Sequence, residues 1–184
     1  MDTGKKNYFK FSLILVLCLL ARLVPFRAPN IEPILAATMP FSKAYGALAG
    51  FSFAILSILL YDTLTGTLGV YTFFTAGAYG MLGLWAAHYF KKNEAGAWSY
   101  VRFAVIGTLF FDALTGLTVG PIFFNQSFIG AFTGQIPFTA LHLLGNIVFA
   151  FVLSPVIYNF VIKKKKKEKP SIMNILNPKI IQIP

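Results

Sequence analysis

The chain is divided into long apolar stretches by polar breaks, several of which carry lysine, and this alternation limits the possible folds. The long apolar stretches are 11–26, 44–61, 68–90, 98–114 and 137–162. Of the 184 residues, 57% are hydrophobic and only 12% are charged, whereas a soluble domain carries about 25% charged residues. So little charge does not cover the surface of a soluble protein of this size. The sequence therefore predicts an all-α integral membrane protein.

The segment after the first long stretch predicts a short additional helix. Residues 27–33 contain two prolines and are typical of a loop, and the apolar residues 34–41 are too few to cross a bilayer. We expect a short, half-buried helix that dips inward, an interruption at Lys43, and then a full span. Residues 115–135 are rich in glycine and predict a structured, partly re-entrant loop. The predicted fold is a six-helix transmembrane bundle with a short second helix.

The positions of the basic residues predict how this bundle is oriented. With the N-terminus inside, the lysine clusters all fall on the cytoplasmic face and only Arg22 and Arg27 fall outside. We therefore expect residues 1–10 to be a cytoplasmic N-terminus, 11–162 the membrane domain and 163–184 a basic cytoplasmic tail. The protein is predicted to be a multi-pass protein of the cell membrane in contact with lipid. No nucleic-acid partner is expected, because the sequence lacks a basic helix with interleaved aromatic residues.

Polar residues gather at the expected outer end of the bundle, where ionisable side chains are functional candidates. Two of them belong to an internal repeat: residues 61–66 read YDTLTG and residues 111–116 read FDALTG, which places Asp62 and Asp112 at equivalent positions. Each aspartate has two compatible interpretations: it ends its helix before a turn, or it contacts a solute. The predicted solute-binding residues are Asp62, Asp112, Asn125, Gln126, His142, Asn146, Arg22 and Asn30.

Several of these side chains also have a purely structural interpretation. His142 and Asn146 lie one helical turn apart and share a face, so they either bond to another helix or form the floor of a pocket. Arg22 is expected to pair with one of the two aspartates in preference to contacting solute, and Glu32 is a weaker candidate. No metal site is predicted, because the histidines are far apart in depth and lack Cys or Glu at ligand spacing. No catalytic residue is predicted, because the sequence has no Gly-x-Gly-Asp motif and no Ser/His/Asp set, and no cofactor is expected.

Small residues follow one another at helical spacing in two of the predicted spans. They are Gly46, Gly50, Ala76, Gly77, Gly80 and Gly83. Small residues let helix backbones approach closely in a membrane. We expect them to pack helices within the bundle, in preference to forming a smooth face along which a partner helix slides.

Several short motifs follow one another along the chain. They are RLVP at 22–25 with Pro29 and Asn30, AYGALAG at 44–50 leading to Tyr61 and Asp62, GAYG at 77–80 with Gly83, and QIPFTALH at 135–142 continuing to Asn146, Ser154 and Pro155. Taken in this order, the motifs resemble those of the S components of energy-coupling-factor (ECF) transporters. The likeness covers about residues 10–162 and rests on the order and placement of the motifs.

This resemblance implies a membrane-embedded binding subunit that is not itself an enzyme. Such a protein captures a vitamin or a related micronutrient outside the cell and docks on a transmembrane coupling subunit driven by two cytoplasmic ATPases. The sequence departs from the family in one respect, because residues 12–21 lack the Ala-x-x-x-Ala face that often serves for docking. The alternatives from other classes are a structural or assembly scaffold and an intramembrane hydrolase that uses paired aspartates.

Overall fold

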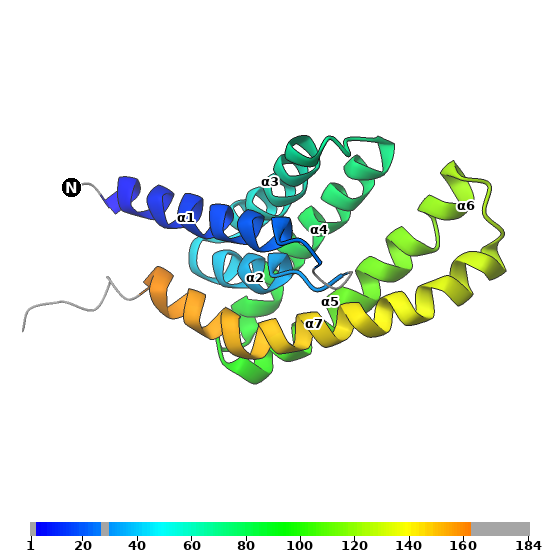
Figure 1. The fold of residues 1–184 in the computed structure, drawn as a ribbon. Helices are drawn as coiled ribbons and strands as arrows, with labels where there is room; N and C mark the ends of the chain where they lie inside the picture. Colours follow the sequence, from blue (N-terminus) through cyan, green and yellow to red (C-terminus); the bar gives the residue numbers. More distant parts are fainter. Residues whose placement is uncertain (1–2, 27–29, 163–184) are drawn as a thin grey trace, which may run out of the picture.

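A computed structural model describes residues 3–26 and 30–162, and this part of the chain folds into seven α-helices without a strand (Figure 1). The helices are α1 Thr3–Leu23, α2 Ile34–Tyr45, α3 Ala47–Thr65, α4 Val70–Lys92, α5 Ala97–Gly116, α6 Val119–Phe123 and α7 Phe128–Ile162. The predicted all-α class is confirmed. The predicted cytoplasmic tail, residues 163–184, lies outside the described residues.

Three stretches of the described chain are long and apolar enough to cross a membrane: Ala47–Thr65, Ala97–Phe123 and Phe128–Val161. This composition is that of a membrane-embedded protein. The helices α1 and α4 occupy the positions of two further predicted spans. The complete six-span arrangement and the cytoplasmic location of both termini stay predictions.

The short helix α2 lies at the centre of the bundle, packed against α3, α4 and α7. Residues 34–42 are all buried, so this helix is covered more completely than the half-buried helix that we predicted. The predicted interruption at Lys43 is wrong. The helix continues because the Lys43 amine donates hydrogen bonds to the backbone carbonyls of Phe90 and Asn93 at the end of α4. It ends at Gly46, whose φ of 91° favours glycine.

Side chains of α2 contribute to both apolar cores of the molecule. Ile34, Leu35 and Met39 pack with residues of α3, α4, α5 and α7. Ala37 and Phe41 pack on the other side with residues of α1, α3 and α7. The second helix therefore joins the two halves of the interior.

Close contact between α3 and α4 depends on two of the small residues. A Cβ on Gly83 would lie 2.6 Å from the backbone carbonyl of Gly50, so neither helix has room for a side chain at this contact. The Ser42 hydroxyl of α2 donates to the Gly83 carbonyl at 2.9 Å. Packing within the bundle is confirmed for this pair, whereas a Cβ on Gly46 or on Gly77 would meet no other atom within 4 Å.

Two antiparallel helix pairs, α3 with α4 and α5 with α7, diverge towards the end of the molecule that carries α6 (Figure 1). We call this the aspartate end, because α3 and α5 stop there shortly after Asp62 and Asp112. The rings of Phe74 on α4 and Phe123 on α6 make an edge contact between the pairs, with centroids 5.1 Å apart.

The loop predicted for residues 115–135 is wrong over most of its length. The short helix α6 lies within it, and α7 already begins at Phe128. The apolar residues before Pro137 continue the helical run of the last span. Proline is tolerated inside a long apolar helix when its surroundings satisfy the freed backbone group, so Pro137 does not mark the beginning of this helix.

Candidate functional site

Two deeply buried polar contacts join α5 to α7. His142 Nδ1 lies 2.8 Å from Asp112 Oδ1, and the exposed fractions of these side chains are 3% and 2%. One turn further along both helices, Asn146 donates to the Thr108 hydroxyl at 2.8 Å. Residues four apart lie on one helix face, so the two bonds form successive rungs between antiparallel helices. The prediction that His142 and Asn146 share a face is confirmed, and both bond to another helix.

Tyr79 brings α4 to the same cluster. Its hydroxyl donates to Glu32 Oε1 at 2.8 Å and lies 3.4 Å from His142 Nε2. Tyr79 is fully enclosed, with a ring centroid 4.4 Å from that of Phe111. A phenol buried among apolar groups needs a polar partner for its hydroxyl, and here it has two.

Arg22 completes the cluster from α1. Its Nε lies 2.9 Å from Glu32 Oε2, its terminal nitrogen donates to the Ser57 carbonyl at 3.2 Å, and its guanidinium lies 3.8 Å from the centre of the Tyr61 ring. The prediction that Arg22 pairs with an aspartate is wrong, because Glu32, immediately before Pro33 and α2, occupies that position. Burial of both groups makes this pairing necessary.

We call these five residues, Arg22, Glu32, Tyr79, His142 and Asp112, the buried polar chain. They come from α1, the segment before α2, α4, α7 and α5, and each contacts the next. A charged or polar group in an apolar interior is stable only when it is paired. Glu32 thus has a central place, although its sequence context made it a weaker candidate.

Asp62 does not belong to the buried polar chain. Its Oδ2 accepts a hydrogen bond of 2.6 Å from the Thr72 hydroxyl, which itself accepts from the backbone N–H of Gly69 at the beginning of α4. The Asp62 carbonyl accepts from the Thr67 N–H at 2.9 Å. Asp62 therefore stabilises the turn between α3 and α4, which agrees with the helix-ending interpretation for this copy of the repeat.

The three remaining predicted site residues lie in connections. Asn30 and Asn125 have left-handed backbones, with φ of 63° and 51°, a conformation that asparagine tolerates better than most residues. Asn125 and Gln126 are exposed between α6 and α7, and the Gln126 N–H donates to the Gly120 carbonyl at 3.2 Å. The structure gives them a role in turns and does not bring them to the buried polar chain.

Asp112 also lines a groove between α5 and α7 at the aspartate end. The groove has a volume of about 380 Å³, and most of its wall is apolar. Its lining residues are Leu109, Asp112, Ala113, Leu117, Phe132, Gln135, Ile136, Thr139, Ala140 and Leu143. The Gln135 amide donates to the Thr139 hydroxyl at 3.2 Å. A mainly apolar cavity with a few polar groups is the usual form of a small-molecule site.

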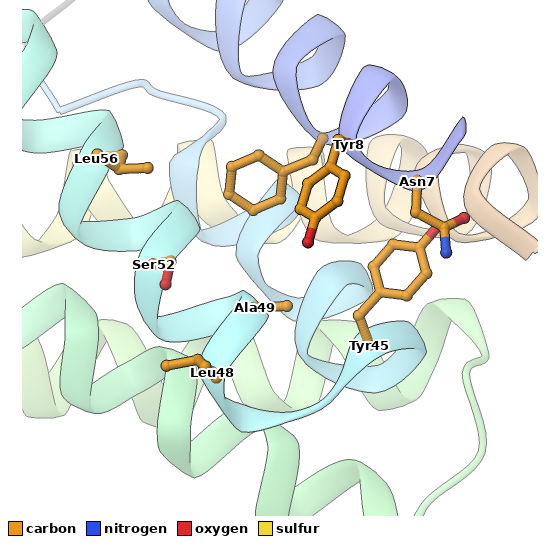
Figure 2. Close-up of a pocket in the computed structure, with 8 residues that line it drawn as sticks. Asn7, Tyr8, Tyr45, Leu48, Ala49, Ser52 and Leu56 are labelled. Atoms are coloured by element: carbon orange, nitrogen blue, oxygen red, sulfur yellow. The ribbon is translucent and has the colours of Figure 1, made fainter. Parts of the chain in front are cut away.

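A second groove, of about 500 Å³, lies between α1 and α3 at the opposite end of the bundle (Figure 2). Figure 2 shows Asn7 and Tyr8 from α1 facing Tyr45 from α2 and Leu48 from α3. The Tyr45 hydroxyl donates to Asn7 Oδ1 at 3.1 Å, and partial burial raises the pKa of Tyr45. This groove contains no residue of the buried polar chain.

Sequence reasoning missed Tyr79, Thr108 and Thr72. Thr108 precedes Asp112 by one helical turn, as His142 precedes Asn146. This matching spacing could have identified Thr108 as the partner of Asn146. Nothing in the sequence next to Tyr79, which follows Gly77 and Ala78, indicates a polar contact.

Within residues 3–26 and 30–162, no group of three or more His, Cys, Asp or Glu side chains is placed to hold a metal.

The fold and the site define a helical membrane bundle with a buried polar chain beside an apolar groove. Comparison with family models, with curated proteins and with solved structures finds no match to the chain.

Proposed function

We propose that the protein is the membrane-embedded, solute-binding subunit of an ECF-type importer. It captures a small, vitamin-like molecule at its extracytoplasmic face. The observation that carries this proposal is the buried polar chain, which ends at Asp112 on the groove between α5 and α7. Ionisable groups inside an apolar bundle are costly and commonly mark solute pathways.

The position of the groove supports the same function. It opens at the aspartate end, which faces outward if the lysine clusters face the cytoplasm. Its volume of about 380 Å³ is within the range of small-molecule sites. Uptake then requires energy from elsewhere, and the resemblance to S components supports a transmembrane coupling subunit with two ATPases as that source.

The two alternative functions fit the contacts less well. A hydrolase with paired aspartates needs two carboxylates within a few ångströms, whereas in the described chain Asp62 bonds to Thr72 and Asp112 to His142. A scaffold explains the buried polar chain as an internal brace but leaves the groove beside Asp112 without a role.

The test is purification of the tagged full chain in mild detergent from membranes of the cells that produce it. We expect one multi-pass subunit and two nucleotide-binding subunits in fixed stoichiometry, with ATP hydrolysis in the eluate. An unrelated tagged membrane protein from the same cells is the control. Recovery of envelope-assembly proteins without an ATPase would favour the scaffold and contradict the proposal.

A further inference from the structure

The contacts of the buried polar chain determine how many hydrogens it holds. The Tyr79 hydroxyl has one hydrogen, which it donates to Glu32, so towards His142 it acts as an acceptor and Nε2 is the donor. The contact between His142 Nδ1 and Asp112 Oδ1 holds a further hydrogen on one of these atoms. The three bonds from Glu32 to Asp112 thus hold three hydrogens, and this count is unchanged if each hydrogen moves along its own bond.

This count of hydrogens gives the net charge of the buried polar chain. Without the three hydrogens, the four groups from Glu32 to Asp112 would carry four negative charges, so with them they carry one. The guanidinium of Arg22, 2.9 Å from Glu32, balances that charge. With no hydrogen on Asp112 Oδ2 or on Glu32 Oε2, the buried polar chain is therefore neutral as a whole, whichever of His142 and Asp112 holds the shared proton.

One hydrogen-bond acceptor of the neutral buried polar chain has no donor among the described residues. Asp112 Oδ2 is buried and lacks a hydrogen-bond partner among the described residues, while Asp112 Oδ1 is engaged by His142. Asp112 also lines the apolar groove between α5 and α7. A buried acceptor left unpaired costs free energy that a donor restores. A donor on a molecule in the groove needs to provide only a hydrogen bond.

We propose that this groove binds an uncharged solute with an apolar body and one O–H or N–H donor for Asp112 Oδ2. The inference names the substrate class of the importer and so rests on the proposed function. A cation is disfavoured because it would lose its hydration in an apolar groove without a net negative charge to compensate it. A carboxylate is disfavoured because it has no hydrogen to donate at neutral pH.

The test uses three photolabels that share one apolar body: 4-benzoylbenzyl alcohol, 4-benzoylbenzylamine and 4-benzoylbenzoate. The full chain is labelled in nanodiscs, and the modified peptides are mapped by mass spectrometry. We expect the alcohol to label α5 and α7 around the groove saturably and about tenfold more efficiently than the amine or the acid, which corresponds to one hydrogen bond.

Two variants connect the labelling to the site. Asp112→Asn is expected to abolish the preference for the alcohol. Ala113→Leu fills the groove without altering the buried polar chain, and is expected to remove saturable labelling even if Asp112→Asn does not fold. The matched control, Ala49→Leu, fills the groove of Figure 2 instead and should leave labelling unchanged.

Three results would overturn the inference: equal or better labelling by the amine, labelling unaffected by Ala113→Leu, or no saturable labelling by any of the three compounds. Any of these combined with recovery of the ATPase complex would reject only the solute class. Loss of the ATPase complex as well would reject the importer itself.

Discussion

The two copies of the internal repeat have nearly the same sequence but different structural roles. In the copy at 61–66, Asp62 bonds to Thr72 across the adjacent turn, and the helix ends at Gly66 with a φ of 68°. In the copy at 111–116, Asp112 bonds to His142 on a helix thirty residues away in the chain, and the helix continues through Gly116. The threonine of each copy, Thr65 or Thr115, donates to the carbonyl four residues earlier.

The difference shows that the partners, and not the repeat itself, decide the function of the carboxylate. Asp62 faces the beginning of α4, where a threonine is the available donor, and is 7% exposed. Asp112 faces the interior side of α7, where a histidine and an asparagine lie on one face, and is 1% exposed. Only the second copy is therefore part of an interaction that spans several helices.

The strongest test of this comparison replaces each aspartate by alanine. We expect Asp112→Ala to lower the free energy of unfolding by roughly 3–5 kcal/mol, because it leaves His142 buried without its partner. Asp62→Ala should cost about 1 kcal/mol, the value of one ordinary hydrogen bond. Denaturant titration in detergent micelles measures both, and equal costs would contradict the assignment of separate roles.

A smaller effect is expected when the partner side chain is changed and the aspartate is kept. Tyr79→Phe removes the hydroxyl between Glu32 and His142 and should cost roughly 1–3 kcal/mol, because it leaves two buried groups with one partner fewer. Thr72→Val, the matched change next to Asp62, should cost about 1 kcal/mol. If Thr72→Val proved the more damaging of the two in the same titration, the buried polar chain would not be the main polar contact of the bundle.

The smallest effect concerns the glycine that closes each copy. Gly66→Ala places a Cβ on a left-handed residue and should cost about 1 kcal/mol. Gly116 has no such conformation, but a Cβ there would lie 1.8 Å from the Gln135 side chain and would displace it. Gly116→Ala should therefore change stability little and instead separate Gln135 from Thr139. Crystallography or NMR of the variant detects this movement, and an unmoved Gln135 would refute it.

The fold class and most helix positions could be predicted because the length of an apolar stretch and the polar breaks beside it act locally. The positions of α3, α4 and α5 follow directly from such stretches. Two features escaped prediction. The beginning of α7 lies before Pro137, where apolar surroundings override the usual helix-ending effect of proline. Lys43 lies within a helix because two carbonyls at the end of a distant helix accept from it.

The candidate site was predicted in part, for a different physical reason. Asp112, His142 and Asn146 were recognisable because ionisable or amide side chains are rare inside apolar runs. The pairing of these side chains was not recognisable, because contacts between helices depend on the rotation of each helix about its axis, which the pattern of residues in one sequence does not reveal. For this reason the pairing of Arg22 with Glu32 was not predicted. The place of Tyr79 in the buried polar chain was missed because its sequence neighbours do not indicate it.

The central position of α2 has a consequence for how the molecule is made. This helix is too short to span a bilayer and contributes to both apolar cores, so it has no stable location in lipid before its neighbours exist. One of those neighbours, α7, is the last helix of the described chain to leave the ribosome, and its Ser154 hydroxyl donates to the Ala36 carbonyl at 2.8 Å. Native packing around α2 is thus completed only after α7 has been synthesised. Nascent chains arrested before α7 are expected to present α2 to chaperones and quality-control proteases.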